Sequence, residues 1–323
     1  MKICIYGAGA IGGYIGAMLA RRGEAVVSLV ARGPHLAAMQ ERGLTLKIGD
    51  VNFTVHPTVS DAPEKLGPQD YVILTLKAHG LEAIADAVQP LIGPNTAFVF
   101  AQNGLPWWYF YKHGGPYDGH RLTSVDPGGH IWKCFDPERC IGSVVWQSAE
   151  MEAPGIIRHS YGDRMPLGEP DSSRSPRALA LSQLLISAGI KSPVRTNLRS
   201  EIWLKLWGNL SFNPLSVLTG QTLEAMAHDS GIAAIIRTMM MESHAIATSL
   251  GITFTISAEE RMEMAAKVGA HRTSMLQDVE AGRPTELEAL LGSVIELSEL
   301  TGIPAPTCAM IYNLTRARIA AHN

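Results

Sequence analysis

A glycine-rich turn close to the N-terminus constrains the fold of this chain more than any other feature of its sequence. Residues 2–6 form a short apolar run that is suited to a buried parallel strand. Gly7, Gly9 and Gly12 then give the spacing G-x-G-x-x-G, and a helical pattern follows over residues 11–22. Strand, glycine turn and helix in this order are the context in which the motif binds a dinucleotide. The turn lets the backbone approach a pyrophosphate, whose negative charge is favoured at the helix N-terminus.

The glycine motif alone does not decide between two kinds of ligand. Methyltransferases that use S-adenosylmethionine also place a glycine turn after their first strand. A nucleotide cofactor is favoured here, because the turn lies at the very start of the chain and a second strand follows closely. The residues that we expect to contact this cofactor are Gly7, Ala8, Gly9, Ala10, Ile11 and Gly12.

The residue after the second strand indicates which nucleotide binds. We expect this strand at residues 25–31, followed by Arg32. An NAD site usually has Asp or Glu at this position to bind the ribose 2′-hydroxyl, whereas an arginine suits the 2′-phosphate of NADP. The other interpretation of Arg32 is a solvated side chain in a loop that continues to Gly33 and Pro34. The position at the strand end favours NADP.

Up to about residue 195, apolar strands alternate with helical stretches, which predicts a doubly wound parallel sheet. Strands at residues 71–76 and 96–101 lead to Lys77 and Asn103, respectively. Ligands of such folds bind beyond the carboxyl ends of the strands, so both side chains could reach the cofactor or the substrate. A plain turn role is about as plausible for each. The other expected elements are a helix at 81–91 closed by Gly93 and Pro94, shorter strands at 141–147, 155–159 and 165–168 that complete the sheet, and a helix from Ser175 to Ala188.

The second half of the chain has a different pattern. From residue 198 onward it is helical, and no further strand alternation appears. We therefore expect two domains, a Rossmann-type α/β domain over residues 1–195 and an all-helical domain over residues 196–323. The expected helices span residues 198–212, 231–250, 258–269, 286–301 and 305–320.

A polar stripe on an otherwise apolar helix is the strongest candidate for a site in the helical half. Lys205, Asn209 and Asn213 recur at every fourth position and therefore share one face of a helix. Burying a lysine and two carboxamides without partners is costly, so the stripe faces either water or a ligand that hydrogen-bonds to it. On spacing alone, a solvated face is the more common case.

Two further polar clusters in the helical half contain Ser274 and Glu286. Helix capping explains both of them on spacing alone. Ser274 and Gln277 fit a capping box. Thr285 and Glu288 fit a second one, and Glu286 would occupy the favourable first turn of that helix.

Composition indicates a cytoplasmic enzyme that acts on small molecules. A net charge of −3 and the lack of a basic stripe make nucleic acids and anionic membranes poor partner candidates. The four cysteines form no C-x-x-C pair, which suits a reducing compartment. No apolar run approaches the ~20 residues that cross a bilayer, and the first residues lead into the glycine turn rather than forming a signal peptide. A homodimer stands beside a monomer as an option, because the methionine run at residues 239–241 could pack in a core or in an interface.

A segment rich in aromatic residues and histidines spans residues 105–140. It contains five aromatic residues in a row, from Trp107 to Tyr111, followed by His113, His120 and His130. The spacing of the histidines matches no standard ligand pattern, so we expect no metal site. A loop that is partly packed by its aromatic residues and overhangs the ligand cleft is the better interpretation.

Taken in order, these motifs resemble those of the ketopantoate reductases (2-dehydropantoate 2-reductases) over nearly the whole chain. The motifs are GAGAIG, Arg32, LTLKA, AQNG, W-x-K-L-x-x-N-x-x-x-N-P, TSMLQD and a later Thr-Glu pair. The glycine turn is shared with many oxidoreductases, whereas the C-terminal motifs are specific. The resemblance implies a Rossmann domain joined to a helical domain, with NADPH and substrate in the cleft between them.

The resemblance also implies roles for individual residues. The implied catalytic residues are Lys205 and Glu286. The implied substrate-binding residues are Asn103, Asn209, Asn213 and Ser274. The implied cofactor contacts are Gly7 to Gly12, Arg32, Lys77, Asn103 and Glu286.

The chemistry of such a reaction suits these residue types. Hydride passes from the nicotinamide to the ketone carbon of a 2-oxo acid, and the Lys205 ammonium can stabilise the developing oxyanion and then protonate it. We therefore expect an NADP-dependent oxidoreductase that reduces ketopantoate to pantoate, a step of pantothenate biosynthesis. Leu223 stands where relatives often carry a further polar substrate contact. A sibling reductase that acts on another 2-oxo acid is therefore the first alternative, and a non-catalytic NADP-binding sensor is the second.

Overall fold

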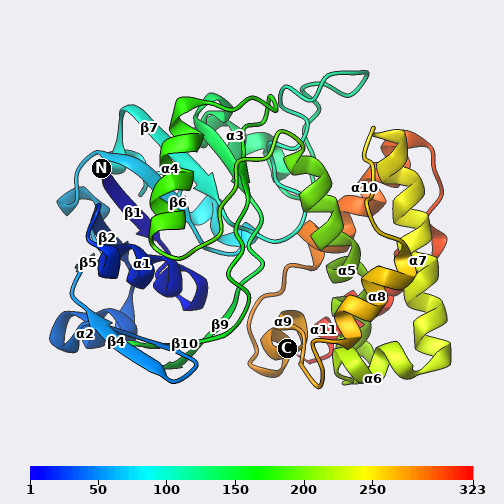
Figure 1. The fold of residues 1–323 in the computed structure, drawn as a ribbon. Coiled ribbons are helices and arrows are strands. Elements are labelled where there is room, and N and C mark those ends of the chain that lie inside the picture. Colours follow the sequence, from blue (N-terminus) through cyan, green and yellow to red (C-terminus); the bar gives the residue numbers. More distant parts are fainter. Residues whose placement is uncertain (323) are drawn as a thin grey trace. The chain divides into compact units, whose positions relative to one another are not determined.

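The computed structural model describes residues 1–322, which divide into two compact units (Figure 1). The first unit comprises residues 1–102, 108–120 and 129–198. The second comprises residues 103–107, residues 121–128 and the described chain from Arg199 onward. The domain boundary that we expect at residue 195 stays a prediction, and the two short segments that join the second unit were not anticipated.

The first unit is built on a seven-stranded sheet in the order β11-β8-β7-β6-β1-β2-β5. All neighbouring strands are parallel except β11, which pairs antiparallel with β8. This arrangement confirms the Rossmann-type sheet. The strands are β1 (Lys2–Tyr6), β2 (Val26–Val30), β5 (Thr58–Ser60), β6 (Gln69–Leu74), β7 (Ile92–Phe100), β8 (Cys140–Ser143) and β11 (Leu167–Gly168).

Helix α1 (Ala10–Arg22) follows β1 as the glycine motif predicts. It ends at Gly23, which has φ +75° and so adopts the left-handed conformation that glycine tolerates best. Three more α-helices lie within this unit, and one of them is α3 (His130–Phe135). Helix α2 (Gly33–Arg42) was not anticipated from the sequence. Helix α4 (Pro176–Ser187) is capped by Ser175, whose side chain accepts a hydrogen bond from the Ala178 N–H as predicted.

A second, four-stranded sheet lies on the other side of α1, in the order β4-β3-β10-β9. Its strands are β3 (Leu44–Ile48), β4 (Val51–Val55), β9 (Ser148–Ala153) and β10 (Ile156–Tyr161). The expectation that the strand at 155–159 completes the main sheet is therefore wrong. Ile157 pairs instead with Leu46, and both are fully buried, which gives this short alternating strand an apolar face to pack on α1.

The prediction of a helix at residues 81–91 is also wrong. The structure has short 3₁₀ turns at η2 (Ala78–Gly80), η3 (Glu82–Ile84) and η4 (Gln89–Leu91), and most of the backbone bonds there span three residues. Pro90 has no N–H to donate and disfavours the helical conformation of the residue before it, which prevents an α-helix from continuing. Gly93 and Pro94 lie inside β7 rather than closing a helix.

The second unit is helical, as predicted. Its elements are α5 (Leu198–Thr219), α6 (Leu223–His228), α7 (Ser230–Ser249), α8 (Ala258–Ala266), α9 (Ser274–Glu280), the π-turn η7 (Glu288–Gly292), α10 (Ser293–Thr301) and α11 (Pro306–Ala320). Helix α5 does not end at residue 212 but continues through Pro214. A proline removes only its own N–H from the helix, and Leu215 and Val217 beyond it are buried, so packing holds the last turn in place.

The aromatic segment at residues 105–140 is packed rather than open. Trp107, Trp108, Tyr109 and Phe110 are all buried, and the rings of His113 and His120 lie against Phe110. The segment also contains the 3₁₀ turns η5 (Pro127–Gly129) and η6 (Pro137–Arg139) and the short helix α3 (His130–Phe135). Elsewhere in the first unit, the 3₁₀ turn η1 (Pro63–Lys65) precedes β6. Over residues 1–322, none of the helices combines the length and the apolar character that spanning a membrane requires.

Candidate functional site

The glycine turn is held between the first two strands of the main sheet. The N–H groups of Gly7 and Ala8 donate to the carbonyl of Val30, at 3.1 Å and 2.9 Å. A Cβ atom at Gly12 would collide with the carbonyl of Gly7 and with the hydroxyl of Thr75, so only glycine lets α1 approach this closely. The N-terminus of α1 has neither a side-chain cap nor an acidic residue in its first turn. The N–H groups of the first turn of α1 and the helix dipole are therefore suited to an anion.

Arg32 lies at the end of β2, directly before α2. Its side chain is exposed, and among residues 1–322 no carboxylate forms an ion pair with it. Its charge acts on the Tyr6 hydroxyl at the end of β1, because burial raises the pKa of Tyr6 and Arg32 partly offsets that rise. Within residues 1–322, Arg32 is thus a cation without a carboxylate partner beside the glycine turn.

The His35 side chain hydrogen-bonds to the backbone of the glycine turn, a role that the sequence did not reveal. The buried imidazole donates from Nε2 to the carbonyl of Ala8 at 2.7 Å and accepts at Nδ1 from the N–H of Gly155 at 2.9 Å. This pair of bonds requires the neutral ring. Burial lowers the pKa of His35 and so favours that form. Its partners lie 27 and 120 residues away, beyond the reach of any local pattern.

The ends of β6 and β7 are tied together by Gln102. Its side-chain amide donates to the carbonyls of Leu74 and Leu76, at 2.9 Å and 3.1 Å. Lys77 follows this turn and is partly buried, immediately before η2. The structure therefore places Lys77 at the carboxyl end of the sheet, as expected, while Gln102 is a supporting residue that sequence reasoning missed.

In the second unit, three of the predicted residues form one chain of hydrogen bonds. The Lys205 ammonium donates to Oδ1 of Asn103 at 2.6 Å, and Nδ2 of Asn103 donates to the Glu286 carboxylate at 2.9 Å. Asn103 therefore stands between a cation and an anion, and each end of its amide faces the charge that suits it. A plain turn residue need not bridge these side chains, so this contact favours the site interpretation of Asn103, which stays a prediction.

The environment of Lys205 changes its acidity. Burial lowers the pKa of Lys205 to about 8, the negative charge of Glu286 opposes that shift, and the positive charge of Arg261 adds to it. The amine is therefore mostly protonated at neutral pH, yet it gives up its proton more readily than an exposed lysine. Such a pKa close to the working pH is the property of an effective general acid.

The loop that carries Asn103 is fixed by the π-turn. Leu105 N–H donates to the carbonyl of Ala289 at 3.0 Å. Gly104 has φ +89°, and a Cβ atom there would collide with the backbone of Ala289. A residue other than glycine would therefore push the Asn103 loop away from η7, the turn that begins two residues after Glu286.

The polar stripe predicted on α5 is present, and its two carboxamides lack protein partners. The opposite side of the helix is packed by Trp203 and Trp207, whose indole N–H donates to the carbonyl of Met240. Asn213 is only 6% exposed, and no side chain or backbone group within residues 1–322 hydrogen-bonds to its amide or to that of Asn209. Asn213 is largely buried, but its amide atoms are not among the side-chain atoms that are both buried and without a partner. A ligand that lies along the stripe could therefore hydrogen-bond to both amides.

The two capping boxes predicted for the other polar clusters are wrong. Helix α9 is capped by Thr273, whose hydroxyl accepts from the Leu276 N–H, so Ser274 occupies the first helical position and is exposed. Thr273 is preferred because it is buried and also hydrogen-bonds to the Ser216 hydroxyl at 2.6 Å. The Glu288 carboxylate accepts from the Tyr312 hydroxyl instead of capping a helix. Ser274 and Glu286 are thus free of the capping roles that spacing suggested.

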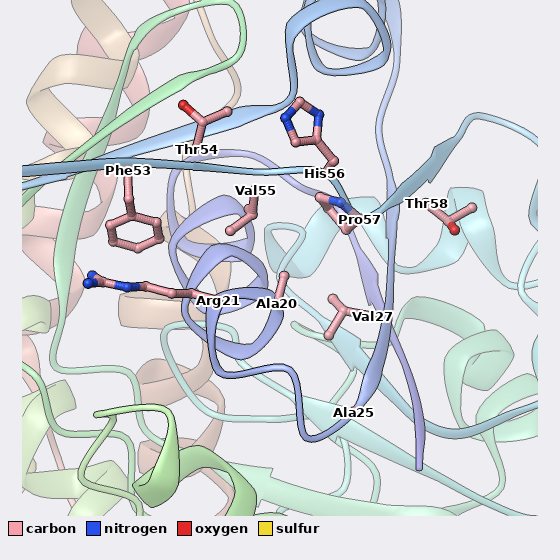
Figure 2. Close-up of a pocket in the computed structure, with 10 residues that line it drawn as sticks. All are labelled: Ala20, Arg21, Ala25, Val27, Phe53, Thr54, Val55, His56, Pro57 and Thr58. Carbon is pink, nitrogen blue, oxygen red and sulfur yellow. The ribbon is translucent and has the colours of Figure 1, made fainter.

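A pocket of about 530 Å³ in the first unit contains none of the predicted residues (Figure 2). It is lined by the last turn of α1, by β4 and by the segment that leads to β5, and the Arg21 guanidinium lies 4.1 Å from the centre of the Phe53 ring. The pocket is at the C-terminal end of α1, whereas the glycine turn is at its N-terminal end. It is therefore separate from the candidate nucleotide site.

Comparison with known families gives two matches. Residues 3–108 match the family described as ketopantoate reductase PanE/ApbA, and residues 197–319 match the family described as ketopantoate reductase PanE/ApbA C terminal. The two regions carry the glycine turn and the lysine stripe, respectively.

Individual proteins give the same result. The chain is 52% identical over 317 residues to the 2-dehydropantoate 2-reductase of Mesorhizobium japonicum, covering 98% of this chain and 97% of that protein. A crystal structure of a putative ketopantoate reductase from Ralstonia solanacearum superimposes with a TM-score of 0.93 at 39% identity, covering 99% of this chain and 98% of the other. The 2-dehydropantoate 2-reductase of Geobacter metallireducens does so with a TM-score of 0.86 at 27% identity, covering 98% and 99%.

Proposed function

This chain belongs to the ketopantoate reductase family, and from that premise we propose that it reduces a 2-oxo acid with NADPH, with ketopantoate as the leading substrate. The observation that carries the proposal is the hydrogen-bonded chain from Lys205 through Asn103 to Glu286. It positions the Lys205 ammonium on the same face of α5 as the side-chain amides of Asn209 and Asn213, to which no other group within residues 1–322 hydrogen-bonds. A site of this kind suits a small polar ligand with a carbonyl oxygen.

The residues of the first unit fit an NADP cofactor. The uncapped N-terminus of α1 would hold the pyrophosphate, because its first N–H groups face an anion that the glycine turn lets approach. Arg32, which has no acidic partner, would bind the 2′-phosphate. Lys77 and Asn103 would contact the ribose and the nicotinamide, and Glu286 would contribute to the same region. Bound NADPH would supply the hydride that the reaction needs.

Lys205 would be the catalytic acid. Its ammonium would hydrogen-bond to the ketone oxygen of the substrate, stabilise the negative charge that develops there, and donate a proton to give the hydroxyl group. Asn103 would hold the ammonium in position, because its Oδ1 already accepts from Nζ. Glu286 would keep Lys205 protonated, since its charge raises the pKa that burial lowers.

The substrate would lie along the α5 stripe. Asn209 and Asn213 can both donate to and accept from its hydroxyl and carbonyl groups. Ser274, exposed at the start of α9, would donate from its hydroxyl to the carboxylate. These roles account for every residue of the stripe and for the uncommitted serine.

A panel of 2-oxo acids tests the proposal directly. Purified protein should oxidise NADPH in the presence of ketopantoate faster than with pyruvate, 2-oxobutyrate or an aromatic 2-oxo acid. A higher kcat/KM for another member of the panel would contradict ketopantoate as the substrate while keeping the reaction class. Tight binding of NADPH without oxidation by any member would instead favour a non-catalytic sensor.

Leu223 gives the sibling reductase a specific observation in its favour. It begins α6 and is partly buried, and its N–H donates to the carbonyl of His271, two residues before the cap of α9. An apolar side chain here would favour a substrate whose far end is apolar over one that carries a hydroxyl group. Exchange of Leu223→Asn should then raise the preference for ketopantoate over an apolar 2-oxo acid.

The proposal extends to the setting of the enzyme. A small molecule is its partner, and neither nucleic acid nor membrane is expected to bind a chain with a net charge of −3. A reducing cytoplasm suits Cys4, Cys134, Cys140 and Cys308, which are all free thiols. Analytical ultracentrifugation would decide between a monomer and a homodimer.

A further inference from the structure

Arg261 is a buried arginine without a counter-charge. It lies on α8 and is 8% exposed, and its Nε donates to the carbonyl of Leu204 at 3.2 Å. This is its one side-chain hydrogen bond to the part of the chain that the structure describes. The two terminal nitrogens of the guanidinium, which carry four of its five N–H donors, therefore have no protein acceptor.

Three arginines of the second unit that have carboxylate partners show what is unusual about Arg261. Arg237, Arg272 and Arg283 each pair with a carboxylate, namely those of Glu259, Glu280 and Asp278. All three are largely exposed, where an ion pair adds little stability. Arg261 is the buried one, and burying a cation without an anion is costly. A cost of this kind is expected where a charge is kept for a ligand.

The position of the guanidinium relates it to Lys205. Its Nε donates a hydrogen bond to the carbonyl of Leu204, the residue before Lys205. Its Nη2 lies over Gly208, where an added Cβ atom would collide with it. Gly208 lies between Lys205 and Asn209 in sequence, so the guanidinium covers the helix surface beside the polar stripe. Its charge also acts on the Lys205 ammonium. Burial lowers the pKa of Arg261 to about 10, which leaves it charged at neutral pH.

We propose that Arg261 binds the carboxylate of the substrate, so that Lys205 and Arg261 together recognise the two adjacent polar groups of a 2-oxo acid. This inference rests on the proposed function, in which Lys205 binds the ketone oxygen. The carboxylate carbon is bonded directly to the ketone carbon, so the cation that meets it must stand beside Lys205. Ser274 can donate one hydrogen bond to the carboxylate but carries no charge, whereas a guanidinium supplies two parallel donors and neutralises it.

The carboxylate preference of the enzyme tests the proposal. We compare kcat/KM for a 2-oxo acid and for its methyl ester in the wild type, in Arg261→Met and in Arg237→Met as a surface control. The preference for the acid should fall about tenfold to a hundredfold in Arg261→Met, the loss expected for one charge-assisted hydrogen-bonded contact. The KM for NADPH should not change, and Arg237→Met should behave as the wild type. An unchanged acid-to-ester preference in folded Arg261→Met would overturn the proposal.

Thermal melts separate ligand binding from a structural role. A buried unpaired cation destabilises the free protein, so Arg261→Met should melt at or above the wild-type temperature when no ligand is present. A melting temperature several degrees lower, or failure to fold, would instead identify Arg261 as a structural brace and overturn the proposal. Gly208→Ala gives a second variant, because it keeps the charge and displaces the guanidinium. It should lose the acid preference as well, and an unchanged preference would count against the proposal.

A binding measurement distinguishes this proposal from the proposed function. Titration calorimetry with oxamate, an unreactive carboxylate, in the presence of NADP⁺ should show binding to the wild type that weakens about tenfold to a hundredfold in Arg261→Met. The methyl ester of oxamate should bind both proteins equally weakly. If the wild type reduces no 2-oxo acid but binds oxamate through Arg261, the proposed function fails and the anion site stands. If oxamate binds both proteins equally, the anion site fails whatever the enzyme reduces.

Discussion

The ammonium nitrogen of Lys205 lies 2.6 Å from Oδ1 of Asn103, a residue 102 positions earlier in the chain. The same amide donates to Glu286, which is 183 positions later than Asn103. One side chain thus connects the proposed acid to its acidic partner. Asn103 lies three residues after β7, which is the fifth strand of the main sheet counted from the β5 edge. The residue that orients Lys205 is therefore supplied by the loop that leaves the Rossmann-type sheet.

Cofactor selectivity should depend on Arg32. Replacing Arg32 with Ala removes a charge-assisted contact to the 2′-phosphate, worth ~1.5–3 kcal/mol, so the KM for NADPH should rise about tenfold to a hundredfold. The KM for NADH, which lacks this phosphate, should change little. Arg42→Ala is the matched control, because Arg42 is exposed at the other end of α2 and pairs with the neighbouring Glu41. Equal use of NADH and NADPH by the wild type would contradict the assignment.

The loop of Asn103 should depend on Gly104. Gly104→Ala places a Cβ atom against the backbone of Ala289 and also forces alanine into a positive φ. Gly114→Ala is the control, because Gly114 has φ +74° but open space around its Cβ position. Both variants should lose ~1–2 kcal/mol from the left-handed conformation. Only Gly104→Ala should also lower kcat, because it displaces the orienting amide. Equal kcat values in the two variants, measured beside thermal melts, would show that the loop position does not matter.

The sequence predicted those parts of the molecule that depend on local pattern. The glycine turn required a strand before it and a helix after it, and β1 and α1 have those bounds within one residue. Helix periodicity likewise located α4, α7 and α11. The same reasoning placed Lys205, Asn209 and Asn213 on one face of α5, where Lys205 contacts Asn103.

What the sequence could not predict depends on contacts between distant segments. The strand predicted at residues 155–159 was assigned to the main sheet because it is short and apolar. Only its pairing with β3 places it in the second sheet. Pro214 is a helix breaker by propensity, but the packing of the turn beyond it overrides that preference. Thr273 and Ser274 can both cap a helix, and burial against Ser216 selects the threonine. The roles of His35 and Arg261 likewise follow from single long-range contacts.

The pH dependence should report the acidity of Lys205. The protonated amine is the active form, and burial lowers its pKa to about 8, so kcat should fall as the pH rises through about 8 rather than near the usual 10.5 of lysine. The charged groups that act on Lys205 are Glu286, which raises its pKa, and Arg261, which lowers it. Glu286→Gln removes the first influence and still accepts from Asn103. The alkaline limb of the kcat profile should therefore move to lower pH in Glu286→Gln. A limb that stays in place would show that another group titrates.

The mechanism depends most on Lys205 itself. Lys205→Ala should lower kcat by ~10²–10⁴, the usual effect of losing a positioned general acid. Binding of NADPH should be nearly unchanged, because the glycine turn and Arg32 would make the main contacts. Lys205→Arg should restore little activity, since a guanidinium has a different shape and a pKa too high to release a proton readily. Lys267→Ala is the control, because Lys267 is an exposed lysine at the end of α8. If Lys205 were only a surface lysine, both alanine variants would keep wild-type kcat and melt within ~0.5 kcal/mol of the wild type. A folded Lys205→Ala protein with wild-type kcat would therefore end the catalytic assignment.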